Sequence, residues 1–139
     1  MRRNEIELLA PVGSYASLVA AKQGHADAVY FGADTLNMRS GSSDMFVSND
    51  IYTLTARAHE YGLKAYLTLN TIIYDNDIPI MERLLDEAAR AGVDAIIASD
   101  IAVILDARAR NLSVHISTQQ NISNSRAVEY FAQWADTVV

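Results

Sequence analysis

The sequence predicts an α/β fold, the N-terminal part of a (β/α)8 barrel with about five strand–helix units and a parallel sheet. Short apolar runs alternate with helix-like segments along the chain, which is typical of parallel sheets covered by helices. A complete barrel needs roughly 250 residues, whereas this chain has 139. The competing architecture is a doubly wound open sheet, but no G-x-G-x-x-G follows the first apolar run. The chain also stops within a strand-like pattern, so we expect residues 1–139 to form a single truncated barrel domain.

Two strand–helix units are expected first. Ile6–Ala10 is a short apolar run, and Ser14 is suited to cap the next helix because its hydroxyl can accept an N–H of the first turn. Gly24 fits the end of that helix, where we expect a positive φ. The second strand is expected at Asp27–Phe31. After a long irregular stretch, the second helix is indicated by apolar residues at helical spacing, namely Ile51, Leu54, Ala58 and Tyr61.

The third unit begins with Lys64–Leu69, an apolar run that predicts a strand. Asp77 is a candidate N-cap, and Pro79 fits the first turn of the helix behind it. The stripe that should face the sheet consists of Met81, Leu84, Leu85 and Ala88.

The fourth unit combines a strand at Asp94–Ala98 with a helix that runs to about Arg110. Asp100 directly follows the strand, and capping of the helix is the preferred interpretation of its carboxylate. On this helix we expect one buried face, formed by Ile101, Ile104 and Leu105.

The fifth strand is predicted at Val114–Ile116, the fifth helix at residues 125–133, and the start of a sixth strand at residues 136–139. A weak internal repeat supports this phasing, because similar segments join a helix end to an apolar strand. In each copy an aspartate precedes the strand: Asp27, Asp94 and Asp136.

Composition excludes several classes of protein. Half of the residues are hydrophobic, which allows a sizeable core. The formal net charge of −6 argues against a stand-alone nucleic-acid binder, although a larger protein containing this segment could still contact RNA. There is no cysteine, so the chain can form neither disulfides nor thiolate metal sites. The first residues lack a long apolar core, and we expect a cytoplasmic location without signal peptide or membrane span.

The sequence contains no motif that would explain peptide hydrolysis. Neither H-E-x-x-H nor G-x-S-x-G occurs, and no metal site is expected. His115 and Ser117 are too close in sequence to infer a catalytic triad, because no third orienting group can be named.

Several short motifs occur in an order and spacing that point to a known family. They are Glu7–Ser14, Gly24 with Ala26–Gly32, Thr68–Thr71, and His115–Gln119 with Asn121. Together they resemble the N-terminal region of the collagenase-like peptidase family, U-thirty-two, of unassigned catalytic type. The resemblance covers essentially the entire chain but only the first part of a family member.

This resemblance implies two kinds of activity. The older family label is peptidase, including collagen degradation. Several bacterial members are instead associated with prephenate-dependent tRNA uridine hydroxylation, rRNA cytidine hydroxylation or ubiquinone synthesis, with an iron–sulfur cluster bound by cysteines later in the chain. We therefore expect RNA hydroxylation by the full-length protein, with the cluster outside this segment and prephenate and RNA as candidate ligands. The alternatives are a peptidase and an inactive scaffold fragment.

Candidate site residues follow the predicted strands. Asn70 could orient a substrate carbonyl or base edge, since its amide both donates and accepts, or it could be a turn residue. His115 is a candidate general base or a ligand for a substrate acid, and the alternative is a hydrogen-bonded core residue. Strand alternation puts Ser117 and Gln119 on the face of His115, although both could instead cap the next helix.

The long irregular stretch adds Asn37 and Arg39. An arginine can bind carboxylate or phosphate through two parallel hydrogen bonds, which would suit prephenate or RNA. The alternative is a solvated loop arginine.

An incomplete barrel leaves unpaired backbone groups on its first and last strands and part of its core uncovered. We therefore expect self-association through the exposed sheet edges, or marginal stability.

Overall fold

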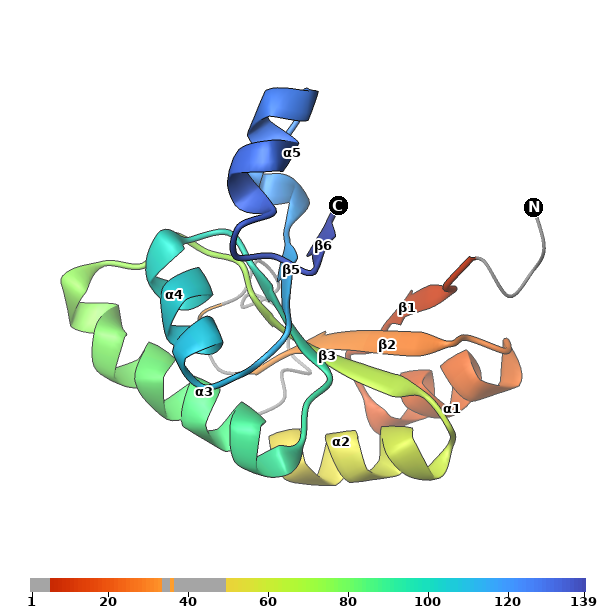
Figure 1. The fold of residues 1–139 in the computed structure, drawn as a ribbon. Helices are drawn as coiled ribbons and strands as arrows, with labels where there is room; N and C mark the ends of the chain where they lie inside the picture. Colours follow the sequence, from red (N-terminus) through yellow and green to blue (C-terminus); the bar gives the residue numbers. More distant parts are fainter. Residues whose placement is uncertain (1–5, 34–35, 37–49) are drawn as a thin grey trace.

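The computed structural model describes residues 6–33, 36 and 50–139. Six strands form one parallel sheet in the order β1-β2-β3-β4-β5-β6, so that each strand pairs with its neighbour in the chain. The sheet curls and carries helices on its outer face, in the form of a half-barrel (Figure 1). The prediction of an α/β fold that forms the first part of a (β/α)8 barrel is confirmed. A doubly wound sheet would reverse its strand order at a switch point, and this sheet does not.

The elements are short and follow the expected alternation. The strands are β1 (Leu9–Pro11), β2 (Ala28–Gly32), β3 (Lys64–Leu69), β4 (Ala95–Ala98), β5 (Val114–Ile116) and β6 (Thr137–Val138). The helices are α1 (Tyr15–Gln23), α2 (Asp50–Glu60), α3 (Ile78–Ala91), α4 (Ile101–Ala109) and α5 (Ser125–Phe131), with single 3-10 turns at η2 (Asp75–Asp77) and η3 (Thr118–Gln120). None of the helices in the described ranges is long and apolar enough to cross a bilayer.

Helix capping follows local sequence. Ser14 Oγ accepts the Ser17 N–H at 3.2 Å and Ser17 Oγ accepts the Ser14 N–H at 2.9 Å, which makes a reciprocal capping box. Asp100 caps α4 as predicted, since its carboxylate accepts an N–H of the first turn. Asp77 does precede α3, but its carboxylate accepts the Tyr74 N–H at 3.0 Å and no N–H of α3. Asp77 therefore holds the preceding turn together.

The end of α1 and the start of β1 differ from expectation. Gly24 has φ −76°, and the positive φ falls on His25, at 57°. Glycine suits this position because the Ala20 carbonyl lies close to it: a Cβ on residue 24 would be 3.3 Å from that oxygen. The first strand begins at Leu9 instead of Ile6, whose side chain is 53% exposed.

Helix α4 buries a different face from the one expected. Ile101 and Leu105 are 43% and 47% exposed, so two of the three residues assigned to the buried face lie on the surface. The helix begins with five apolar residues, and an apolar run of this kind does not distinguish one stripe from the next. Contact with the sheet instead selects Val103, Ile104 and Ala107.

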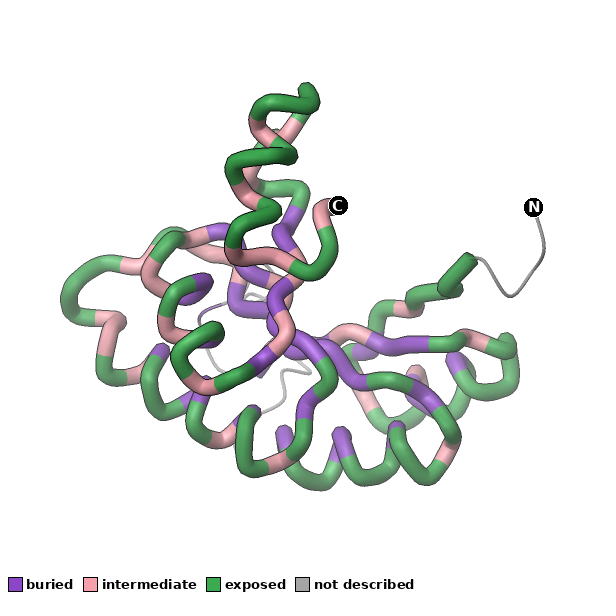
Figure 2. Tube along the Cα trace, viewed as in Figure 1, coloured by how far each residue is buried: buried purple, intermediate pink, exposed green. Residues whose placement is uncertain are grey.

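The two faces of the sheet differ in character. Figure 2 shows that the central strands are mostly buried, whereas the helices carry buried and exposed residues in turn. Toward the helices, β3 contributes Ala65, Leu67 and Leu69 to the main apolar core. Toward the barrel axis it presents Tyr66 and Thr68, because successive side chains of a strand alternate between faces. The inner face thus carries a second, smaller cluster, formed by Ala28, Tyr66 and Ala95 with Tyr30 and Ile97 packed against it.

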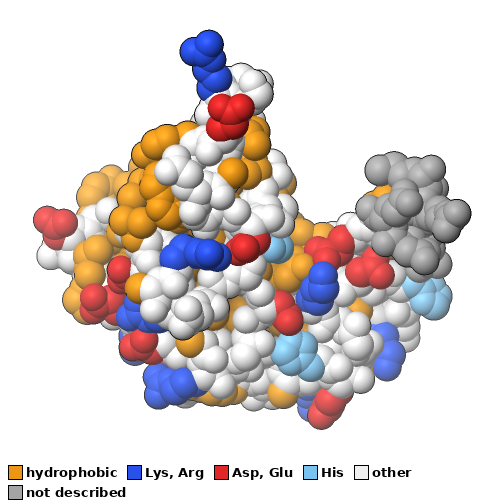
Figure 3. All heavy atoms as spheres, viewed as in Figure 1, with side chains coloured by type: hydrophobic (Ala, Val, Ile, Leu, Met, Phe, Trp, Pro, Cys, Tyr) orange, Lys and Arg blue, Asp and Glu red, His pale blue; other side chains and the backbone are white. Residues whose placement is uncertain are grey.

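Helix α5 stands apart from the layer formed by the other helices (Figure 1). It has no buried residue, and Val128 and Tyr130 are 41% and 52% exposed. Hydrophobic atoms are visible over this part of the surface in Figure 3. Phe131 and Trp134 still pack against the main core, which ties the C-terminal end of α5 to the body.

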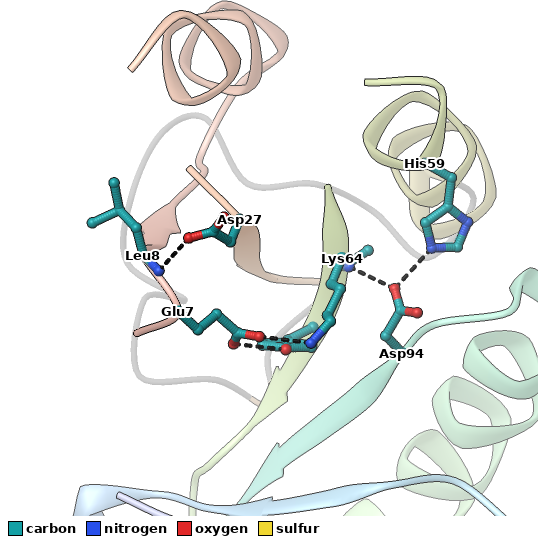
Figure 4. Close-up of polar contacts among 8 residues, drawn as sticks. Glu7, Leu8, Asp27, His59, Lys64 and Asp94 are labelled. Atoms are coloured by element: carbon teal, nitrogen blue, oxygen red, sulfur yellow. Dashed lines mark hydrogen bonds and ion pairs between the residues drawn. The ribbon is translucent and has the colours of Figure 1, made fainter. Parts of the chain in front are cut away.

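An aspartate fixes the amino end of every second strand. Each donates its own N–H to the carbonyl of one residue on the preceding strand or just before it, and its carboxylate accepts the N–H of that same residue. We call these paired contacts the aspartate bridges; Figure 4 shows the carboxylates of two of them. The carboxylate-to-nitrogen distances are 2.8 Å for Asp27 with Leu8, 2.7 Å for Asp94 with Ala65, and 2.9 Å for Asp136 with Val114.

These are the three aspartates of the weak repeat, and further side chains strengthen two of them. Asp94 also binds His59 Nε2 at 2.8 Å. Asp136 accepts the Ser113 hydroxyl at 2.8 Å and an Arg108 N–H at 3.0 Å. The hydrogen bond from the Val114 N–H is the main cause that lowers the pKa of Asp136, with Ser113 and Arg108 adding to it against a smaller opposing effect of burial.

We expect Asp94→Ala to destabilise the 139-residue chain by about 1–3 kcal/mol, because the Ala65 N–H would lose its carboxylate partner in a partly buried position. Urea unfolding followed by circular dichroism measures this. Glu60→Ala removes an exposed carboxylate from the neighbouring end of α2 and should change the free energy of unfolding by less than about 0.5 kcal/mol. Equal effects of the two substitutions would contradict the role of the bridge.

The lowered pKa of Asp136 also predicts a pH dependence. Because the carboxylate is favoured in the folded state, its contribution is complete above the unfolded pKa of about 3.9 and is lost as pH falls through the lower folded value. Thermal melts between neutral pH and pH 3 should therefore show a shallower acid loss for Asp136→Ala than for wild type. The exposed Glu129→Ala variant should keep the wild-type slope. Parallel slopes for all three proteins would refute the assignment.

Candidate functional site

The carboxyl half of the inner face lines an open pocket of about 310 Å³, which we call the chamber. It lies where β2, β3, β4 and β5 end, the position at which barrels of this type carry their chemistry. None of the described side chains that line it is charged. They are Leu9, Tyr30, Thr68, Asn70, Ile97, Ser117, Thr118 and Val139.

Asn70 and Ser117 meet at the rim of the chamber. The Asn70 amide nitrogen lies 3.4 Å from Ser117 Oγ, although the two residues come from β3 and β5 ends that flank β4. Ser117 is only 4% exposed and also accepts the Gln119 N–H at 3.3 Å. Its hydroxyl therefore caps η3, and the residue also lines the chamber, while its assignment to substrate binding stays a prediction.

Gln119 reaches the rim by another route than strand alternation. The strand ends at Ile116 and the chain turns into η3, so the expectation that alternation carries Gln119 onto the face of His115 is wrong. Gln119 instead lines an adjoining outer groove of about 510 Å³. Asn70 borders both cavities, and Gln120 fixes the groove by a hydrogen bond from its amide to the Ser99 carbonyl.

His115 is half-buried on the inner face but does not line the chamber. Its ring packs edge-on against Tyr66, with centroids 4.7 Å apart and planes at 69°. Burial lowers the pKa of His115, against an opposing effect of the Glu7 charge, and so favours the neutral imidazole. No carboxylate of the described residues hydrogen-bonds this ring.

A charged cluster lies at the amino ends of β1 and β3. Glu7 accepts hydrogen bonds from Lys64 Nζ and from the Tyr66 hydroxyl, each at 2.8 Å (Figure 4). Burial, followed by the hydrogen bond to Glu7, raises the pKa of Tyr66. Sequence reasoning missed this cluster, because Glu7 and Lys64 meet only when β1, β2 and β3 lie side by side.

Thr68 is a second residue that sequence reasoning missed. It is 7% exposed, and its hydroxyl oxygen is buried without a hydrogen-bond partner among the described residues. The sequence could have predicted it, because alternation within Lys64–Leu69 puts Thr68 on the same face as Asn70, two residues further along.

Asn37 and Arg39 lie outside the described residues, so their assignment to substrate binding stays a prediction. Within residues 6–33, 36 and 50–139, no three histidine, aspartate or glutamate side chains are grouped so that they could hold a metal ion.

The fold defines the chain as part of a (β/α) barrel with a polar carboxyl rim. A solved U32 peptidase matches it with a TM-score of 0.77 at 14% identity, over 95% of this chain and 57% of that one. Deoxyribose phosphate aldolase from Aeropyrum pernix matches with a TM-score of 0.75 at 16% identity, over 96% and 63%. At these identities the likeness concerns the fold alone. The family follows from sequence: residues 13–139 match the model of peptidase family U32, and the chain belongs to that family.

Curated relatives carry two kinds of name. A collagenase of Porphyromonas gingivalis is 47% identical over 139 residues, which is 100% of this chain and 34% of the relative. The tRNA hydroxylation protein P1 of Bacillus subtilis is 36% identical over 91% of this chain and 30% of its own length. A 23S rRNA 5-hydroxycytidine synthase of Escherichia coli is 33% identical over 93% and 19%. The chain spans about a third or less of the length of these relatives, and the predicted family membership is confirmed.

Proposed function

We propose that this chain is the N-terminal barrel portion of a cytoplasmic protein that hydroxylates RNA, at a tRNA uridine or an rRNA cytidine. The observation that carries the proposal is the hydrogen-bonding rim that Asn70, Ser117 and Gln119 form at the chamber and the adjoining groove. Amide groups offer donors and acceptors together, as the edges of unpaired bases require. Relatives named for tRNA and rRNA hydroxylation align with more than nine-tenths of the chain, which supports the same assignment.

The reaction needs parts that this chain does not contain. Iron–sulfur clusters are held mainly by cysteine thiolates, and the chain has no cysteine, so its residues do not fit such a cluster. In this proposal other residues of the full-length protein hold the cluster. Arg39 and Asn37, which lie outside the described residues, stay predicted to bind substrate, because an arginine suits the carboxylates of prephenate.

The residues of this chain then bind and orient the RNA base. Asn70, Ser117 and Gln119 contact it at the chamber and the outer groove. His115 is a weaker catalytic candidate, because its ring packs against Tyr66 and the residue does not line the chamber.

A peptidase is the second candidate, favoured by the 47% identity to a collagenase. Such an activity would need Ser117 to be activated by a base such as His115. The Ser117 hydroxyl is engaged by Asn70 and Gln119, and the His115 ring packs on Tyr66, which is not the arrangement of a nucleophile with its base. If the isolated chain cleaved peptides and lost this activity in His115→Ala, the peptidase would replace RNA hydroxylation. If neither form were active, the inactive scaffold fragment would remain.

For the full-length protein we expect Asn70→Ala to lower RNA hydroxylation about tenfold, the effect of losing one buried hydrogen bond to the base. The readout is mass spectrometry of nucleosides from cells that lack their own hydroxylation protein and express the variant. Asn76→Ala is the matched control, since Asn76 is exposed in η2 outside both cavities. Full hydroxylation by Asn70→Ala, or none by the wild type, would overturn the proposal.

We also propose that the 139-residue chain self-associates through its sheet edges. In the described structure β1 pairs only with β2 and β6 only with β5, and Leu9 and Val139 at these edges are 37% and 58% exposed. Lysine on an edge strand opposes strand addition.

Light scattering after size-exclusion chromatography should thus show dimers or larger species for the wild type and monomers for Leu9→Lys. Ile72→Lys, a change at a 70% exposed residue away from the strands, should associate like the wild type. A monomeric wild type at all concentrations would exclude this proposal.

A further inference from the structure

The hydroxyl of Thr68 is buried, and no described group forms a hydrogen bond with it. Its neighbours Leu67 and Leu69 belong to the core beneath the helices, so Thr68 projects to the opposite face and into the chamber. The residue is 93% buried, as its 7% exposure implies, and no described group bonds its hydroxyl oxygen. A buried polar atom without a partner is costly, and such atoms in native proteins call for a specific explanation.

The chamber around Thr68 has two different walls. Leu9, Ile97 and Val139 supply apolar surface, together with the ring of Tyr30. The other wall carries the hydroxyls and the amide described above. Because none of the described lining side chains is charged, an anion placed here would lose its hydration without gaining a counter-charge from them. The walls therefore suit a neutral ligand that is apolar on its flat faces and polar at its edge.

Volume limits the ligand further. At about 310 Å³ the chamber is near the lower end of small-molecule sites. A single ring fits this space, and Tyr30 offers it an aromatic surface of the kind on which unpaired bases stack. The Thr68 hydroxyl can either donate or accept, so it can bond the ring carbonyl oxygen of uracil or of cytosine.

We infer that the chamber holds one uncharged pyrimidine ring, that Thr68 Oγ1 hydrogen-bonds it, and that a dicarboxylic acid such as prephenate binds outside the chamber. This inference rests on the proposed RNA function. It adds Thr68 as a residue that contacts the substrate. It also assigns the base to the chamber and the dicarboxylic acid to a site outside it.

Uridine is the probe for this inference, titrated into the 139-residue chain and followed by amide chemical shifts in NMR spectra. Thr68→Val keeps the shape of the side chain and removes the unpaired hydroxyl, so we expect a melting temperature at or above that of the wild type and about tenfold weaker uridine binding. Thr68→Ser keeps the hydroxyl and should bind like the wild type. Added prephenate should leave bound uridine in place.

The matched control is Thr55→Val. Thr55 lies in α2, is fully buried at 0% exposure, and also has a hydroxyl that no described group bonds, but it lies among the core residues between the helices and the sheet. Its substitution should raise or maintain stability without changing uridine binding. Unchanged binding in Thr68→Val, equal loss in Thr55→Val, displacement by prephenate, or a wild type that does not bind uridine would each overturn the inference.

The outcome separates this inference from the proposed function. Uridine binding that depends on Thr68, in a full-length protein that hydroxylates no RNA, would refute the function and leave the chamber assignment intact. Normal RNA hydroxylation by full-length Thr68→Val would refute the chamber assignment and leave the function intact.

Discussion

Strand register is the constraint on which the rest of this structure depends, and the aspartate bridges hold it between β1 and β2, between β3 and β4, and between β5 and β6. In each bridge one aspartate exchanges two hydrogen bonds with a single residue of the neighbouring strand, so the two strands cannot shift past one another without breaking both. A slip by one residue would turn every side chain of a strand to the other face. Thr68 would then enter the helix-side core and Leu67 the chamber. The polar rim is therefore a consequence of contacts made at the opposite end of the sheet.

The two ends of the half-barrel carry different chemistry. At the amino end, Glu7 joins Lys64 and Tyr66 in a charged cluster, and the aspartate bridges lie beside it. At the carboxyl end the described side chains that line the chamber are uncharged, and the polar ones carry hydroxyls and an amide. Charged pairs at the amino end hold strands together, and neutral groups at the carboxyl end leave room for a ligand. This division agrees with the general rule that barrels place stability at one face and chemistry at the other.

Much of the fold could be predicted because its determinants are local. The capping box at Ser14, the cap at Asp100 and the stripe of α3 each depend on residues within one or two turns. The errors arose where the local pattern was ambiguous. Helix α4 is apolar over most of its first turns, so only contact with the sheet could select its buried face. Gln119 lies beyond the end of β5, where alternation no longer describes the chain.

The sequence by itself determined that strands and helices alternate, where most of them begin and end, and that polar residues follow the strands. It could do so because hydrogen bonds within a turn and the alternation of a strand involve residues close together in the chain. Only the tertiary structure decided that Asn70 meets Ser117, that His115 turns toward Tyr66, and that no described group bonds the Thr68 hydroxyl. These facts depend on which strands lie side by side and in what register. Neighbouring parallel strands come from segments that are far apart in sequence, so neither their order nor their register can be read from the local pattern.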